Sequence, residues 1–209
     1  MKSIFIYGEN NILKNYKKAF SRDDCKCVIS KNLPDVDEYD CLVLAGGGDI
    51  SPKFYNQENE FCENVDEERD EAEFYLIERF LSKNKKVVGI CRGLQVINVY
   101  FRGTLLQNVK YHSLKNGDDY HFIYNEPSTF IYDLYGKSCW VNSAHHQVVD
   151  KLGSGLRAAA FSFDGYIEAL FHKKYSVYAV QFHPERMVNG NRLINFFLPW
   201  NVKSRVSAK

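Results

Sequence analysis

The stretch that most constrains the fold runs from Lys86 to Asn98 and joins two segments through one cysteine. Its first half is an apolar run rich in β-branched residues, which predicts a buried strand, and its second half has helical spacing. Cys91 lies between them, and Gly89 and Gly93 on either side let neighbouring backbone come close. A tight strand-to-helix turn presents a nucleophile, and a helix N-terminus favours a thiolate. The stretch therefore predicts a reactive cysteine.

The composition indicates a globular protein, and we expect one domain over residues 1–209. A net charge of +1 gives no electrostatic reason to expect nucleic acid or a membrane surface as a partner. No segment approaches the roughly 20 apolar residues of a membrane span, and the N-terminal apolar run is too short for a secretory signal. The six cysteines contain no CxxC pair, so we expect neither a zinc site nor a disulfide framework. A reducing cytoplasm suits a free thiol.

Strand-like and helix-like segments follow one another along the chain. The pattern predicts strands at 3–7, 25–30, 40–45, 86–90, 120–124, 165–172 and 175–182. It predicts helices at 10–20, 66–81, 91–101 and 190–199. We expect Cys25 and Cys27 to be small core residues, with metal ligation as the lesser alternative because no other ligand stands nearby.

Three glycines, 46–48, directly follow the buried-type strand 40–45. They place bare backbone N–H groups at the carboxyl edge of the sheet, where open α/β folds bind ligands. An ordinary flexible loop is an equal alternative for this run. It is not a phosphate loop, because no Gly-Lys-Ser/Thr follows.

A histidine and a carboxylate stand close together at the end of the last predicted strand. Gln181-Phe-His183-Pro-Glu185 places both side chains on the same side of an extended chain. The proline favours extended backbone at His183. Glu185 can then orient the imidazole ring, which supplies a base and its orienting group for Cys91.

Other polar residues are open to more than one interpretation. The helix 66–81 carries a charged face that we expect to be solvated, with the alternative that Arg69 or Asp70 reaches the active-site edge. We expect His112 and His121 to be structural or supporting residues, because neither has a carboxylate in fixed register. The loop at 142–147 is dense in hydrogen-bonding side chains and suits a polar ligand, although a turn with incidental histidines is an equal alternative.

Three pieces, Gly46–Gly48, Gly89–Gln95 and Gln181–Glu185, together resemble the class I glutamine amidotransferase-like superfamily in order and spacing. Within it the chain is most similar to the peptidase C26 group of the γ-glutamyl-γ-aminobutyrate hydrolase type. Four features indicate this: Arg92 after the cysteine, the run 95–99 followed by 103–107, the helix 66–73 and the segment 142–147. The resemblance implies an α/β fold of three layers, doubly wound and flavodoxin-like, with a mostly parallel central sheet and a nucleophile elbow.

The resemblance also implies a role for each site residue. Cys91 would be the nucleophile, His183 the general base and then acid, and Glu185 the residue that orients His183. The backbone N–H groups that would form the oxyanion hole belong to Gly47, Gly48 and Arg92. The residues that would hold the glutamyl group are Gln95, Ser143, Ala144, His145 and His146. No metal and no cofactor are expected.

The implied activity is hydrolysis of a γ-glutamyl amide bond through a γ-glutamyl thioester. The chain is short for the γ-glutamyl-γ-aminobutyrate group, and compact relatives hydrolyse γ-glutamyl-CDP-amidate in capsule phosphoramidate biosynthesis. Arg92, Lys110 and Lys115 fit such a phosphorylated leaving group, which is therefore preferred over other γ-glutamyl conjugates. A glutaminase subunit that supplies a separate synthase is the alternative function. We expect a small-molecule substrate and no obligatory synthase partner, and a homodimer is compatible with the sequence.

Overall fold

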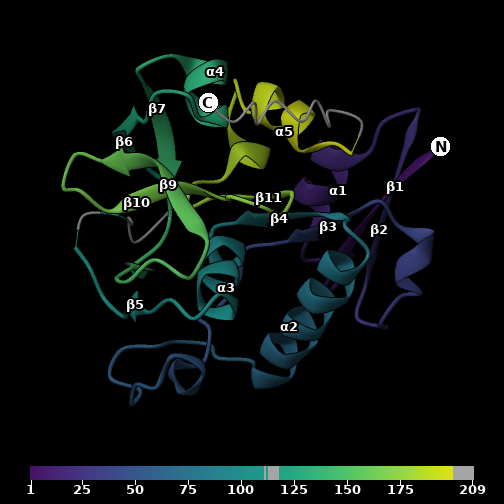
Figure 1. The fold of residues 1–209 in the computed structure, drawn as a ribbon, viewed down its shortest axis with the longest axis horizontal. Helices are drawn as coiled ribbons and strands as arrows, with labels where there is room; N and C mark the ends of the chain where they lie inside the picture. The colour runs from purple at the N-terminus through teal and green to yellow at the C-terminus, as the bar shows by residue number, and fades with distance from the viewer. Residues whose placement is uncertain (111, 113–117, 200–209) are drawn as a thin grey trace.

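The computed structural model describes residues 1–110, 112 and 118–199, and its centre is a nine-stranded sheet (Figure 1). Its strands are β1 (Lys2–Tyr7), β2 (Cys25–Ser30), β3 (Cys41–Leu44), β4 (Lys86–Ile90), β6 (Asp119–Asn125), β7 (Ser138–Ser143), β9 (Leu156–Ser162), β10 (Ile167–His172) and β11 (Val177–Val180). Their order across the sheet is β2-β1-β3-β4-β11-β10-β9-β6-β7. Two short strands, β5 (Leu105–Leu106) and β8 (Val148–Val149), form a separate antiparallel pair.

Helices cover both faces of the sheet. The α-helices are α1 (Lys14–Phe20), α2 (Glu67–Ser82), α3 (Arg92–Tyr100), α4 (Phe130–Tyr135) and α5 (Asn191–Phe197). Three 3-10 helices are η1 (Val36–Glu38), η2 (Pro52–Tyr55) and η3 (Pro184–Arg186). Figure 1 shows α2 and α3 on one side of the sheet and α1 and α5 on the other, which makes three layers. None of the helices in the described ranges combines the length and apolarity needed to cross a bilayer.

The sheet is mixed, and the two kinds of pairing divide it into halves. The strands from β2 through β11 pair in parallel, with β4 between β3 and β11. Beyond β11 the pairs with β10, β9, β6 and β7 are antiparallel. The predicted α/β fold with helices on both faces is confirmed. The strand β4, which leads to Cys91, lies in the parallel half of the sheet.

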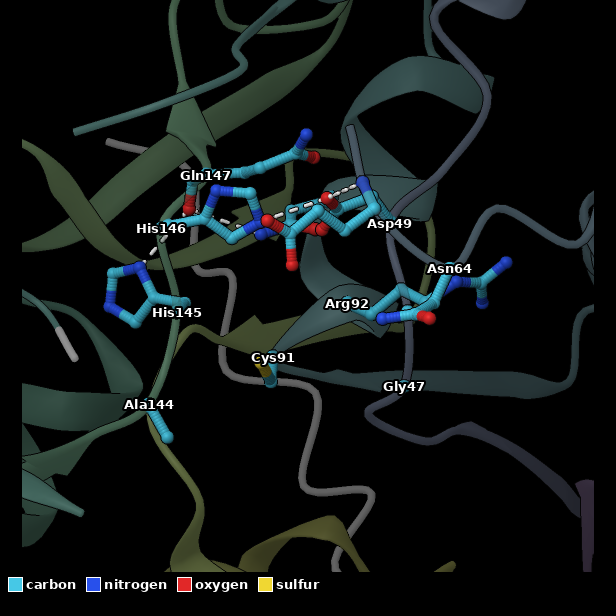
Figure 2. A pocket seen from close by; sticks show the side chains of 12 residues that line it. Gly47, Asp49, Asn64, Cys91, Arg92, Ala144, His145, His146 and Gln147 are labelled. Atoms are coloured by element: carbon cyan, nitrogen blue, oxygen red, sulfur yellow. Dashed lines mark hydrogen bonds and ion pairs between the residues drawn. The ribbon is translucent and has the colours of Figure 1, made fainter. Parts of the chain in front are cut away.

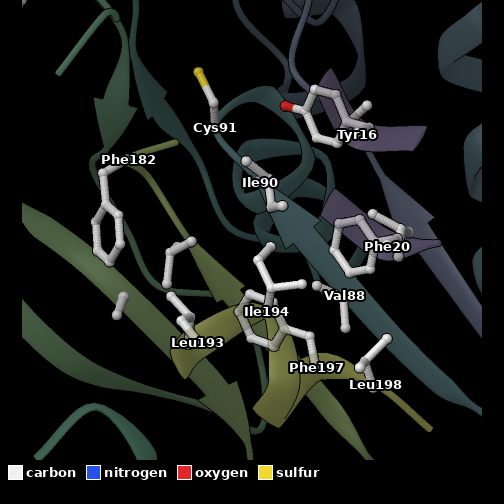
Figure 3. Close-up of a cluster of buried hydrophobic side chains, with 14 of the residues drawn as sticks. Tyr16, Phe20, Val88, Ile90, Cys91, Phe182, Leu193, Ile194, Phe197 and Leu198 are labelled. Atoms are coloured by element: carbon white, nitrogen blue, oxygen red, sulfur yellow. The ribbon is translucent and has the colours of Figure 1, made fainter. Parts of the chain in front are cut away.

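The alternation of side chains along the strands divides the apolar core into two clusters. On β1, Ile4 and Ile6 point into the cluster under α1 and α5, whereas Phe5 points into the cluster under α2 and α3. On β4, Val88 and Val87 divide in the same way. Figure 3 shows the first cluster, with Cys91 at one end and its sulfur directed away from the apolar side chains. Both faces of the parallel half are therefore buried, as parallel sheets require.

Most predicted elements are present within a few residues of their predicted ends. The strand over 25–30 has its predicted bounds, and Cys25 and Cys27 join the apolar cluster, so their prediction as core residues is confirmed. The helix predicted over 10–20 begins only at Lys14. The elements that were not predicted from the sequence include α4, β9 and the short pair β5 and β8.

Candidate active site

Cys91 lies on a strained turn between β4 and α3. Its backbone has φ 55° and ψ −110°, a combination that costs a non-glycine residue free energy and that concentrates at functional sites. Its N–H donates to the carbonyl of Val180 at 2.8 Å, which fixes the turn to β11. A Cβ atom on Gly93 would come within 2.2 Å of the Leu44 carbonyl oxygen. The glycine therefore lets α3 press against β3 and hold the predicted elbow in place.

His183 and Glu185 meet beside this turn. His183 Nδ1 lies 2.7 Å from Glu185 Oε1, and both side chains are almost fully buried. Burial by itself would lower the pKa of His183. The charge of a Cys91 thiolate, the hydrogen bond to Cys91 and then Glu185 outweigh that effect and raise the pKa to about 10. The predicted pairing is confirmed, but the extended backbone predicted for it is wrong, because Pro184 begins the 3-10 helix η3.

Two further side chains hold the backbone around these residues. Asn142, at the end of β7, accepts from the His183 N–H at 2.9 Å and donates through Nδ2 to the His183 carbonyl at 3.2 Å. The Tyr16 hydroxyl accepts from the N–H of Gly46 at 2.9 Å. Neither role follows from the sequence, since Tyr16 has the helical spacing of an ordinary core residue.

The glycine run after β3 lies against the same turn. A Cβ atom on Gly46 would be 3.0 Å from His183 Cε1 and 3.7 Å from Cys91 Cβ. Gly47 and Gly48 line the same cavity as Cys91. Within the described part of the chain, the N–H groups of Gly47, Gly48 and Arg92 have no hydrogen-bond partner. This arrangement can stabilise an oxyanion next to the thiol.

The charged face of α2 contacts both the glycine loop after β3 and the turn that carries Cys91. Arg69 Nη2 donates to the carbonyls of Ala45 and Gly46 at 3.0 and 3.2 Å. Buried Arg92 pairs with Asp70 and Glu73, which are both fully buried. Burial opposes the charge of Arg92, but the two carboxylates keep the pKa of its guanidinium above the usual value. The prediction that this face is solvated is wrong, and Arg69 and Asp70 do reach the active-site edge.

A cavity of about 180 Å³ opens beside Cys91 (Figure 2). It is lined by Gly47, Gly48, Asp49, Glu63, Asn64, Cys91, Arg92, Gln95, Ala144, His145, His146 and Gln147. Pockets for drug-sized ligands measure about 300–1,000 Å³, so this cavity suits a smaller group, about the size of one amino acid. Its walls are the glycine loop, the nucleophile turn and the loop after β7, which lie far apart in the sequence.

Two of the predicted substrate-binding residues have side chains fixed at this wall. His146 Nε2 lies 2.8 Å from Asp49 Oδ2, so the loop after β7 meets the glycine loop (Figure 2). Gln95 donates through Nε2 to the Gln147 carbonyl at 3.1 Å and lies 3.4 Å from Gln181 Oε1. Asp49 was not predicted as a site residue, and its position directly after the glycine run is the signal that could have indicated it.

The other predicted binding residues differ in what they present to the cavity. Ala144 and His145 line it, but His145 Nδ1 lies 3.1 Å from the Gln147 carbonyl and its ring is buried. Burial, and then neighbouring His112, lower the pKa of His145 well below its usual value, so the ring is neutral. Ser143 is not among the lining residues. Its hydroxyl donates to the His112 carbonyl at 2.7 Å, so its side chain is turned away from the cavity.

Three predictions about polar residues near the site need correction or fall outside the described residues. His112 and His121 do have a carboxylate in reach, because both rings lie against buried Glu168. Arg92 is fully paired by carboxylates, so its predicted fit to a phosphorylated leaving group is wrong. Lys110 is exposed, and Lys115 lies outside the described residues.

Comparison with known proteins gives a consistent result for family and fold. The Peptidase C26 family model matches residues 27–185, which is more than half of the chain. The chain is 40% identical over 159 residues to the glutamine amidotransferase-like protein YvdE of Lactococcus lactis, covering 70% of this chain and 66% of YvdE, just under two thirds. It is 31% identical over 160 residues to the gamma-glutamyl-CDP-amidate hydrolase of Campylobacter jejuni, covering 76% of this chain and 68% of that protein.

A solved structure of a glutamine amidotransferase from Thermotoga maritima has the same fold. It superposes with a TM-score of 0.61 at 17% identity, and the match covers 93% of this chain and 81% of that one. At this identity the likeness concerns the fold alone. It agrees with the mixed central sheet and the flanking helices described above.

Proposed function

The chain belongs to the Peptidase C26 family of glutamine amidotransferase-like hydrolases, and on that premise we propose that it hydrolyses a γ-glutamyl amide bond through Cys91. The observation that carries this proposal is the position of Cys91 on a strained turn, beside a histidine that a carboxylate orients. Such a set activates a thiol as a nucleophile.

The proposed reaction has two stages. The Cys91 thiolate attacks the γ-carbonyl carbon, and unpaired N–H groups of Gly47, Gly48 and Arg92 stabilise the oxyanion. The tetrahedral species collapses, the C–N bond breaks, and His183 protonates the leaving amine. A water molecule, deprotonated by His183, then attacks the γ-glutamyl thioester, which releases glutamate and returns the thiol.

The cavity supports the glutamyl half of this substrate. Its size suits a group about as large as one amino acid, and its lining includes the acidic residues Asp49 and Glu63. A carboxylate there can pair with the α-ammonium group of a glutamyl moiety. Gln95 and the backbone of residues 144–147 offer further polar contacts.

For the leaving group we propose the amidate of γ-glutamyl-CDP-amidate as the first candidate. The support is the likeness to the Campylobacter jejuni hydrolase of that substrate. The cavity supplies no free cation for a diphosphate among its lining residues, since Arg92 is paired with Asp70 and Glu73. A nucleotide would therefore extend outside the cavity. γ-Glutamyl-γ-aminobutyrate and other γ-glutamyl conjugates are the alternatives.

The proposal is tested by glutamate release from the purified chain. γ-Glutamyl-CDP-amidate, γ-glutamyl-γ-aminobutyrate and L-glutamine are supplied in parallel, and we expect the first to be hydrolysed fastest. Cys91→Ala should abolish hydrolysis of all three while the circular dichroism spectrum is unchanged. Cys27→Ala, on edge strand β2, is the matched control and should keep full activity. Retained hydrolysis in Cys91→Ala would refute the proposed nucleophile.

The same assay separates the proposed hydrolase from a glutaminase subunit that serves a synthase. A hydrolase works alone, whereas such a subunit is nearly inactive without its partner and prefers plain glutamine. Slow turnover of glutamine alone, with every conjugate ignored, would favour the subunit. We propose that no partner is required.

A further inference from the structure

Three histidines and one glutamate are buried together at the wall of the cavity, which His145 lines. Glu168 on β10 is fully buried, His121 on β6 is 6% exposed, and His112 and His145, on loops, are 0% and 6% exposed. The strands β10 and β6 both pair with β9, so these four residues converge on the antiparallel half of the sheet. None of them has a part in the proposed proton transfers.

The three imidazole rings lie around one oxygen of the Glu168 carboxylate. Glu168 Oε1 lies 3.3 Å from His121 Nε2, 3.7 Å from His112 Nδ1 and 3.7 Å from His145 Nε2. All of these atoms lack a hydrogen-bond partner, as does Glu168 Oε2. Nine buried side-chain polar atoms in the described residues are unpartnered, and six of them belong to these four residues. An unpaired buried polar group destabilises the fold, so their concentration in one place needs an explanation.

The separations are those of ligand atoms around a zinc ion. Zinc binds imidazole nitrogen and carboxylate oxygen at about 2.0–2.2 Å, so the edges of its tetrahedron are about 3.3–3.6 Å long. The distances from Glu168 Oε1 to His112 Nδ1 and to His145 Nε2, both 3.7 Å, match these edges within a few tenths of an ångström. The ligand atoms of His112, His145 and Glu168 also lie within 4.8 Å of one another.

The outer nitrogens of two rings are held as in metal sites. His112 Nε2 lies 3.0 Å from Asp164 Oδ2, and Asp164 in turn accepts from the Ser162 hydroxyl at 2.6 Å. His145 Nδ1 lies 3.1 Å from the Gln147 carbonyl. Carboxylate and carbonyl partners of this kind fix the tautomer and leave the opposite nitrogen free for a metal. A dication would also be neutralised by Glu168 together with Asp164.

We propose that His112, His145 and Glu168 bind a zinc ion, with the His121 ring against the same carboxylate. Three protein ligands leave the fourth position of the tetrahedron for a water molecule. The ion would fix His112, whose carbonyl accepts from the Ser143 hydroxyl at 2.7 Å and from the His145 N–H at 3.1 Å. It would therefore hold the loop after β7 in the position that forms the cavity wall. The absence of CxxC pairs conceals such a site in the sequence.

The first experiment measures bound metal directly and does not depend on hydrolysis. The full chain is purified without a histidine tag, exposed to ZnCl₂ and dialysed, and its zinc content is measured by mass spectrometry. We expect one zinc ion per chain, and a loss of at least about ten-fold in Glu168→Gln and His112→Asn. Asp164→Asn, which removes a partner of a ligand, should weaken zinc affinity about 10- to 100-fold. His172→Asn is the matched control, since His172 is also a buried histidine on β10 but lies outside the cluster.

A second measurement uses the unaltered chain, so that unfolding of a variant does not decide the result. After chelation, Co²⁺ should give the intense visible absorption of a tetrahedral site, and Zn²⁺ should abolish it and raise Tm. Wild-type protein that takes up neither ion, or Glu168→Gln protein that binds as much zinc as the control, would overturn the proposal. Zinc uptake that persists in Cys91→Ala would separate this site from the catalytic thiol.

Discussion

His183 Nδ1 lies 2.7 Å from Glu185 Oε1, and only Pro184 separates the two residues in the chain. The 3-10 helix that begins at Pro184 makes this contact, because it turns the Glu185 side chain back onto the ring. With Nδ1 engaged by the carboxylate, Nε2 is the nitrogen left for Cys91. The orientation of the base is thus set within a single turn of the backbone.

Glu185→Gln is expected to lower kcat for glutamate release by about 100- to 10,000-fold, because an amide neither stabilises the imidazolium nor fixes the ring tautomer. Steady-state kinetics on a hydrolysed γ-glutamyl conjugate measure the effect. Glu126→Gln, at an exposed position, is the control and should leave kcat unchanged. Wild-type kcat in Glu185→Gln would contradict the orienting role.

Cys91→Ser is expected to lower the pKa of His183 from about 10 towards its ordinary value. Burial lowers this pKa, whereas the Cys91 thiolate charge and hydrogen bond raise it, so removal of the thiolate leaves the opposing effect of burial. Glu185 remains and keeps part of the increase. An NMR titration of the His183 ring checks the direction. Titration at the same pH in both proteins would show that Cys91 does not set this value.

Asn142→Ala is expected to reduce kcat and to cost about 1–3 kcal/mol of unfolding free energy, because the buried His183 N–H loses its acceptor. Denaturant unfolding and glutamate release measure the two effects. Asn125→Ala removes another buried asparagine, whose Nδ2 donates to the Gly136 carbonyl at 2.8 Å. Asn125 does not line the cavity. It should lose stability but keep kcat. Equal kcat in the two variants would show that Asn142 does not position His183.

Arg92→Gln is expected to lower the free energy of unfolding by about 3–5 kcal/mol, because it leaves the carboxylates of Asp70 and Glu73 buried with less compensation. Lys83→Gln is the control. Its ion pair with Asp37, at 3.0 Å, is largely exposed and should contribute about 0–1 kcal/mol. Chemical denaturation at neutral pH compares the two. Similar small losses in both variants would contradict the structural role of the Arg92 network.

Elements with strong local patterns were predictable from the sequence, and elements without them were not. The strand 25–30 alternates, and the stretch around Cys91 changes its period from strand to helix, so both are found where predicted. The strand β9 was missed because Ala158, Ala159 and Ala160 have low strand propensity, and pairing with β6 and β10 outweighs it. The helix α4 is only six residues long and rests on neighbouring elements.

The candidate site divides in the same way. The sequence determined the cysteine between a strand and a helix and the glutamate two residues after a histidine, because these features lie within one turn of chain. Tertiary structure alone decided that α2 supports the turn through Arg92, and that Asn142 holds His183. It also decided that His112, His121, His145 and Glu168 converge, since their closeness depends on strand order across the sheet and not on spacing along the chain.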